Sequence, residues 1–176
     1  MSETRGHDSQ GGGFQDPHGL ADEGAWAEDF EVGQRMAHPR GATIGEFEGQ
    51  SLAKLVMNTA ESHWNEARFA GGSMLGQGRV VFGLITASLV IGLSSQDTMA
   101  HGIAEVGLQG VRFPAPVHLG DTLHAFTEVV EVDRGYRADA ALVTFRHWGI
   151  RTDGTVVFQG DRAVLVARTT AREDIT

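Results

Sequence analysis

Residues 80–93 read VVFGLITASLVIGL, an uncharged run that decides the fold we expect for this chain. The run is too short to cross a bilayer, which takes about 20 apolar residues, and long for a strand, which usually has about 3–10. We therefore predict a helix buried on every side, with the hydroxyls of Thr86 and Ser88 turned back onto helix carbonyls. A curved sheet would wrap this helix. Gly83 fits its first turn, where backbone N–H groups are open to a ligand.

The composition is that of a globular protein, with 41% hydrophobic and 21% charged residues among 176. A formal net charge of −9 argues against a nucleic-acid-binding surface, which would be basic. The chain has no cysteine, so disulfides and thiolate metal sites are excluded. Its histidines lack ligand spacing, and we expect no metal. The N-terminus lacks the apolar core of a secretory signal, so we expect a cytoplasmic protein that does not bind membranes.

The domain organisation that we predict is simple. Residues 1–24 are rich in Gly, Asp, Ser, Gln and His, can bury little apolar surface, and are expected to form a disordered tail. Residues 25–170 contain no linker or repeat and are expected to form a single domain. Residues 171–176 form a polar C-terminal tail.

Two elements are predicted before the apolar run. Residues 35–44 favour a strand, which Pro39 and Gly41 would make an edge strand or a bulged one. Thr43, with Glu46 three residues later, matches a capping box and predicts a helix from that point.

Two less regular stretches follow this predicted helix. Residues 57–65, MNTAESHWN, form a polar patch. Residues 70–78 are rich in glycine and are read as a plain connector or, alternatively, as a flap beside a site.

The remainder of the chain predicts strands. Alternation and turn signals place them over residues 103–113, 122–132, 140–150 and 155–167, and the sequence Thr152-Asp153-Gly154 predicts the last hairpin. The whole is an α+β layout, with one long buried helix against an antiparallel meander.

Three stretches of this layout resemble the MaoC-like branch of the hotdog fold. They are FEVG at residues 30–33, VRFPAPVHLGDTL at residues 111–123 and DGTVV at residues 153–157. The resemblance implies a central helix wrapped by a curved antiparallel sheet. It also implies a hydratase or dehydratase of acyl thioesters carried by coenzyme A or a carrier protein, with no cofactor other than the coenzyme A of the substrate.

The resemblance also implies site residues. The hydratase motif of the family is Asp-x-Asn-Pro-x-His; its His matches His63, while its catalytic Asp falls on Asn58. A "Met-Asn" sequence at this point is similar to a branch associated with C5 dicarboxylic substrates such as mesaconyl-CoA or itaconyl-CoA. Glu61 and Glu48 are the carboxylates that could replace the missing Asp.

Hydration of an enoyl thioester needs a polarised water, a proton for Cα and a group that stabilises the developing enolate. We assign acid/base catalysis to His63, positioning of water or thioester to Asn58, and the oxyanion contact to the N–H of Gly83. The residues expected to bind the substrate are Phe82, Leu84, Arg112 and Trp64.

Each of these residues has a structural alternative. His63 could simply pack, and Asn58 could cap or turn the chain. Glu48 and Glu61 could be solvated helix carboxylates, Gly83 could only allow close packing, and Arg112 could pair with a coenzyme phosphate or lie along the sheet.

Two rival functions remain open from the sequence. A hotdog thioesterase would need a carboxylate near the start of the helix, where Phe82-Gly83-Leu84 offers none. A non-catalytic acyl-CoA binding subunit would explain the missing Asp. In each case the exposed sheet edges of a single hotdog domain predict a homodimer or a higher homo-oligomer.

Overall fold

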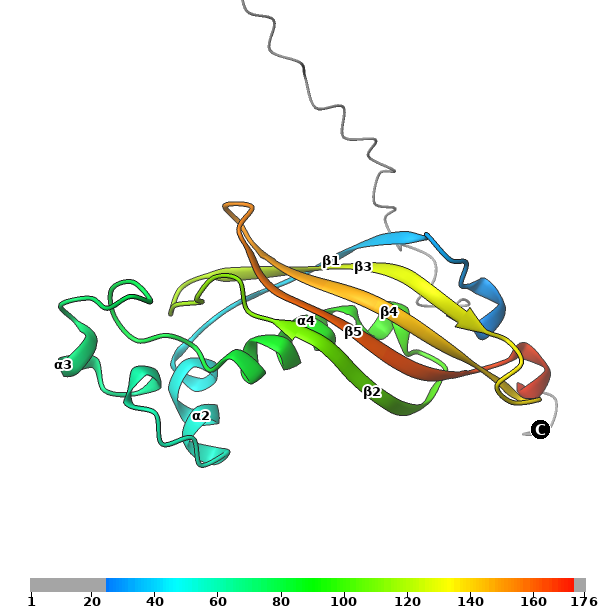
Figure 1. Ribbon diagram of the computed structural model, residues 1–176, viewed down its shortest axis with the longest axis horizontal. Coiled ribbons are helices and arrows are strands. Elements are labelled where there is room, and N and C mark those ends of the chain that lie inside the picture. The colour runs from blue at the N-terminus through cyan, green and yellow to red at the C-terminus, as the bar shows by residue number, and fades with distance from the viewer. Residues whose placement is uncertain (1–24, 173–176) are drawn as a thin grey trace, which may run out of the picture.

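The computed structural model describes residues 25–172, so the predicted N-terminal tail and most of the C-terminal tail lie outside the described residues. The chain builds one antiparallel sheet from β1 (Arg35–Thr43), β2 (Gly102–Arg112), β3 (Thr122–Asp133), β4 (Ala140–Arg151) and β5 (Val156–Ala167). The long helix α4 (Gly83–Thr98) lies against one face of this sheet (Figure 1). This α+β arrangement is the hotdog fold that the resemblance implied.

The strand order in the sheet is β1-β3-β4-β5-β2. The predicted meander is therefore limited to β3, β4 and β5, while β2 pairs with β5 at an edge. The path of the connection after β2 explains why β2 does not pair with β3. The connection first passes the residues before α4, where the Val81 N–H donates to the Val117 carbonyl. It then reaches the end of β1, where the Gly120 N–H donates to the Ile44 carbonyl. The chain thereby moves from one edge of the sheet to the other before β3 begins.

The strand β1 is the other edge, and its register with β3 shifts between Ala37 and Gly41. This confirms the edge position and the bulge expected from Pro39 and Gly41, since proline cannot donate to a ladder. The helix expected from Thr43 begins later, and the predicted capping box is wrong. The Thr43 hydroxyl contacts that of Thr122 at 2.8 Å as part of the sheet.

The shorter helical segments are η1 (Ala27–Asp29), the π-helical η2 (Phe47–Ser51), α2 (Leu52–Leu55), η3 (Glu61–His63), α3 (Glu66–Phe69) and η4 (Thr169–Arg172). Most of those between β1 and α4 project beyond one end of the sheet, next to the N-terminus of α4 (Figure 1). Glu46 does not form the expected capping box with Thr43. Its carboxylate forms an ion pair with Arg79, 2.7 Å away. This ion pair ties η2 to the segment that leads into α4.

The packing of α4 is asymmetric. Ile85, Ala87 and Val90 are buried, but Leu84 and Gly92 leave a face of the helix open, so the prediction of burial on every side is wrong. The sheet approaches the buried face closely at Gly149, where an added Cβ would lie 2.4 Å from Val90 Cγ2. Across residues 25–172, no helix combines the length and apolarity that a membrane crossing requires.

A buried polar chain lies near the C-terminal end of α4. Asp97 accepts a hydrogen bond from His38 at 2.6 Å, His38 contacts the Thr127 hydroxyl at 2.7 Å, and that hydroxyl contacts His147 at 2.8 Å. Burial lowers the pKa of His38, because desolvation outweighs the attraction of Asp97. Desolvation, with the nearby charge of Arg162, lowers the pKa of His147 well below its usual value.

Candidate active site

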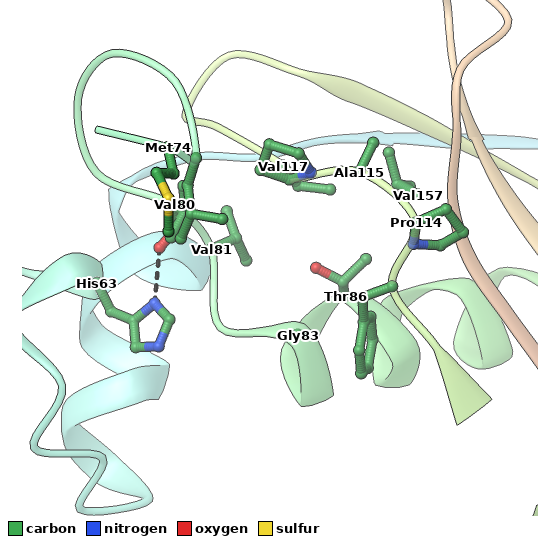
Figure 2. A pocket seen from close by; sticks show the side chains of 13 residues that line it. His63, Met74, Val80, Val81, Gly83, Thr86, Pro114, Ala115, Val117 and Val157 are labelled. Atoms are coloured by element: carbon green, nitrogen blue, oxygen red, sulfur yellow. Dashed lines mark hydrogen bonds between the residues drawn. The ribbon is translucent and has the colours of Figure 1, made fainter. Parts of the chain in front are cut away.

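A cavity of about 400 Å³ lies at the N-terminus of α4 (Figure 2). Its walls come from the end of η3, the stretch that leads into α4, the first turns of α4, the connection after β2, and β5. The lining residues are His63, Met74, Leu75, Val80, Val81, Gly83, Thr86, Phe113, Pro114, Ala115, Pro116, Val117 and Val157. The cavity is largely apolar, and it brings the predicted pair His63 and Gly83 to one place.

His63 is held in a defined orientation at the end of η3. Its Nδ1 lies 2.9 Å from the main-chain carbonyl oxygen of Val80. Because a carbonyl oxygen only accepts, Nδ1 carries the hydrogen, and the Nε2 of a neutral ring is left with a free lone pair. The ring of Phe82 flanks the imidazole, with 5.4 Å between the ring centroids. The histidine is therefore oriented as a base by the backbone.

Gly83 is the first residue of α4, and Phe82 is its N-cap. The N–H groups of Ile85 and Thr86 donate to the Phe82 carbonyl, whereas the first N–H groups of a helix have no acceptor within it. A Cβ at position 83 would lie 3.1 Å from the Phe113 ring. Glycine thus permits close packing and also leaves a backbone donor at the cavity wall, where the helix dipole is positive.

The other predicted catalytic residues do not line the cavity. Asn58 turns its Oδ1 onto the Ala60 N–H, 2.9 Å away, and so forms a local turn. Glu61 accepts a hydrogen bond from Arg68 at 2.6 Å, and Glu48 accepts one from the Gly45 N–H at 3.0 Å. Each group therefore has a partner in its own segment. Their catalytic roles stay predictions, and no carboxylate is found among the residues that line the cavity.

The four residues expected to bind the substrate are also not among the residues that line the cavity. Phe82 contacts His63, and Leu84 lies on the open face of α4. Trp64 is half-buried, with Lys54 Nζ 5.8 Å from its ring centroid. Arg112 ends β2 in an exposed position, next to the lining residue Phe113.

The sequence left one feature of the cavity open, as a connector or a flap, and another was missed. Met74 and Leu75 line it, so the glycine-rich segment 70–78 occupies the place of a flap rather than that of a plain connector. His118 fastens this segment, since its Nε2 lies 3.1 Å from the Leu75 carbonyl and its Nδ1 lies 3.0 Å from the Arg79 carbonyl. Gly72, Gly76 and Gly78 have positive φ angles, which allow the backbone of this segment to turn tightly. The glycines in the sequence therefore indicate a turning segment, but not which of its side chains face a ligand.

The missed feature is the hydroxyl of Thr86, which was expected to bond to a carbonyl of its own helix. Ser88 does so, donating to the Leu84 carbonyl at 2.8 Å. Within residues 25–172, no hydrogen-bond partner is found for the Thr86 hydroxyl, which points into the cavity (Figure 2). Its position three residues after Gly83 was the available signal, because residues three apart share a helix face.

The sequence model of the mesaconyl-CoA hydratases matches residues 8–168. This chain belongs to the mesaconyl-CoA hydratase family. A mesaconyl-CoA hydratase of Haloarcula marismortui is 28% identical over 86% of this chain and 44% of its own length. The chain thus spans less than half the length of this relative.

Two other similar proteins match over most of their own length. An (R)-specific enoyl-CoA hydratase of Rhodospirillum rubrum is 30% identical over 79% of this chain and 90% of its own length. The solved structure of a MaoC-like dehydratase from Rhodospirillum rubrum has a TM-score of 0.71 and 27% identity, and it covers 82% of this chain and 98% of its own. The family assignment and the hotdog fold therefore agree.

Proposed function

We propose that this chain is a lyase that hydrates an enoyl thioester of coenzyme A, or dehydrates the 3-hydroxyacyl thioester. The observation that carries the proposal is a histidine with a free Nε2 in the same cavity as the N-terminus of α4. The family match over residues 8–168 supports this reaction class. A branched C5 dicarboxylic acyl group, such as mesaconyl or itaconyl, is the finer proposal. Coenzyme A enters as part of the substrate, and the reaction requires no other cofactor.

The proposed hydration starts from a water molecule held at Nε2 of His63. The imidazole accepts a proton from this water while the water oxygen bonds to Cβ. The electron pair of the double bond moves toward the thioester oxygen, where the Gly83 N–H and the positive end of α4 stabilise the enolate. The imidazolium then gives its proton to Cα. One imidazole thus serves as base and acid in turn, and the scheme needs no carboxylate at Asn58, Glu61 or Glu48.

The lining of the cavity favours this reaction over thioester hydrolysis, which the sequence left open. A hotdog thioesterase would use a carboxylate to activate water on the carbonyl carbon, and none lines this cavity within residues 25–172. Arg112 is the cation that we propose for a phosphate of coenzyme A, because it is exposed beside the lining residue Phe113. A cytoplasmic location stays a prediction from the sequence.

The test follows two signals in one cuvette: the absorbance of the enoyl thioester and the appearance of free thiol. Crotonyl-CoA, mesaconyl-CoA and itaconyl-CoA are the substrates. Loss of the double bond without release of thiol supports the hydratase. Release of thiol would identify a thioesterase instead. No change with any of the three would leave a non-catalytic binding subunit.

We propose in addition that the chain forms a homodimer along β2. Among the described residues β2 pairs only with β5, so its outer edge is open. Ile103, Val106 and Leu108 on this strand are each about half exposed. If a second copy paired its β2 antiparallel with this one, the open edge would be hydrogen-bonded and these side chains would be covered. In an isolated protomer the same exposed edge would promote aggregation.

Light scattering coupled to gel filtration tests the dimer. We expect the wild type to elute as a dimer and Val106→Lys as a monomer with an unchanged circular dichroism spectrum. Val32→Lys is the matched control, because Val32 is also exposed but lies outside the sheet. A dimer that survives the Val106 change would place the interface elsewhere.

A further inference from the structure

The hydroxyl of Thr86 differs from the other hydroxyls of α4. Ser88, Ser94, Ser95 and Thr98 each donate to a carbonyl of the same helix, at 2.8 to 2.9 Å. Thr86 is only 2% exposed, and no hydrogen bond of its hydroxyl is found in the described part of the chain. Figure 2 shows its oxygen directed into the cavity, whose opposite side carries His63.

Packing alone gives no reason for a hydroxyl at this position. The neighbouring cavity walls are apolar and include Val81, Val117 and Val157. A hydroxyl that opens onto an apolar cavity and bonds to no group of the described chain adds nothing to the packing, whereas valine has nearly the same shape and no polar atom to satisfy. The partner that satisfies Thr86 is therefore expected to be a molecule that enters the cavity.

The position of Thr86 on the helix indicates which atom it meets. It lies three residues after Gly83, so it shares that face of α4 and is about 4.5 Å further along the helix axis. With the thioester oxygen at the Gly83 N–H, this displacement corresponds roughly to the four-bond span from the thioester oxygen to an oxygen bonded to Cβ. The oxygen added to Cβ then lies between the Thr86 hydroxyl and the imidazole of His63.

We propose that the Thr86 hydroxyl binds the oxygen at Cβ: the attacking water in hydration and the 3-hydroxyl group in dehydration. This inference rests on the proposed function of the cavity. One hydrogen of the water is donated to Nε2 of His63 and the other to Oγ1 of Thr86, which leaves a lone pair of the water directed at Cβ. The proton that His63 removes is the one that it later gives to Cα. Thr86 loses no proton and acts by positioning.

The first test compares Thr86→Val with Thr86→Ser in the full chain, with crotonyl-CoA as the substrate. We expect Thr86→Val to lower kcat about 10- to 100-fold, the cost of one hydrogen bond to a reacting oxygen, with less than about a threefold change in KM. Thr86→Ser keeps the hydroxyl and is expected to retain most of kcat. Ser95→Ala, which removes a hydroxyl already bonded to the Gly92 carbonyl, is the control and should leave kcat unchanged.

Two further measurements separate this role from a structural one. The thermal midpoint of Thr86→Val should equal or exceed that of the wild type, because the substitution removes no hydrogen bond between described residues. The second measurement is the ratio of the Kd values of butyryl-CoA and 3-hydroxybutyryl-CoA, which differ by the oxygen at Cβ. The wild type should favour the hydroxylated ligand by about tenfold, and Thr86→Val should bind the two almost equally.

The outcomes distinguish this inference from the proposed function. A wild type inactive on every enoyl-CoA overturns both. An active wild type with an unchanged kcat in Thr86→Val overturns the role of Thr86 alone. Equal losses in the Val and Ser variants, or an unaltered preference for 3-hydroxybutyryl-CoA in Thr86→Val, also overturn it.

Discussion

His63 donates its Nδ1 hydrogen to the main-chain carbonyl of Val80, 2.9 Å away. The bond joins η3 to the residues that lead into α4, so the histidine and the helix N-terminus are positioned by one connection. A second hydrogen bond joins the same two segments in the opposite direction, from the Val80 N–H to the Ser62 carbonyl. The orientation of the imidazole is therefore a property of the backbone, which makes the free Nε2 available without help from a carboxylate.

Removal of this imidazole is expected to abolish most of the activity. General acid–base catalysis by a positioned side chain contributes roughly 10²- to 10⁴-fold, and we expect His63→Gln to lower kcat for crotonyl-CoA by about that factor. The thermal midpoint should change little, because the histidine is only half-buried. His124→Gln, a half-buried histidine of β3, is the control. A His63 variant with wild-type kcat would contradict the mechanism.

The flap is expected to depend on His118. The two ring nitrogens of His118 lie 3.1 Å from the Leu75 carbonyl and 3.0 Å from the Arg79 carbonyl. His118→Gln loses at least one of the two contacts, so Leu75 is held less firmly at the cavity. We expect KM for crotonyl-CoA to rise about 5- to 10-fold, with kcat less affected, as one lost hydrogen bond implies. His101→Gln, in which the lost ring stacks on Trp26, should not raise KM.

Stability is expected to fall in mild acid because of the buried histidines. Burial lowers the pKa of both His38 and His147 in the folded protein, so below about pH 6.5 the unfolded chain binds more protons than the folded one. The free energy of unfolding is therefore at its full value above that pH and is lost as the pH falls toward the folded pKa values. Each histidine can contribute up to about 1.4 kcal/mol per pH unit.

Urea unfolding at about pH 7.5 and about pH 5.5 measures this effect. His147→Gln should show a smaller difference between the two pH values than the wild type does. His124→Gln again serves as the control and should keep the wild-type difference. Equal stability of the wild type at both pH values would rule out the contribution of the buried pair.

The contact between α4 and the sheet is expected to tolerate no added methyl group at Gly149. A Cβ there would lie 2.4 Å from Val90 Cγ2 and 3.2 Å from Phe158 Cβ, so the helix or the sheet would have to shift. Overpacking of this kind costs about 1–3 kcal/mol, and we expect Gly149→Ala to lower the free energy of unfolding by that amount. Gly71→Ala, at a position with open space, should have almost no effect. Similar urea midpoints for the two variants would contradict this packing.

The strands and the long helix were predictable because their patterns are local. Leu123, Ala125, Thr127 and Val129 alternate with exposed or half-buried neighbours, and the structure buries all four. The edge position of β2 was not predictable in this way. It depends on the path of the connection after it, which is decided by contacts such as that between Val81 and Val117 rather than by the composition of the strand.

The site was predictable only in part. His63 and Gly83 could be paired because the resemblance to the family motif marks His63 and the start of the apolar run marks Gly83. Asn58 suits a turn as well as a site, and only the structure shows that its side chain bonds to Ala60. Thr86 carries the same hydroxyl as the helix-bonded Thr98, so the residue type does not separate them, and only the position of Thr86 three residues after Gly83 points to the cavity.

The polar chain near the C-terminal end of α4 has a fixed direction. Asp97 can only accept, so His38 carries its hydrogen on Nδ1 and its Nε2 accepts from the Thr127 hydroxyl. That hydroxyl has one hydrogen, so it must accept from Nδ1 of His147, whose buried Nε2 faces no partner. A proton added to His38 would force the hydroxyl to turn and His147 to change tautomer. The protonation state of His38 thereby decides the tautomer of His147, through the hydroxyl of the single threonine between them.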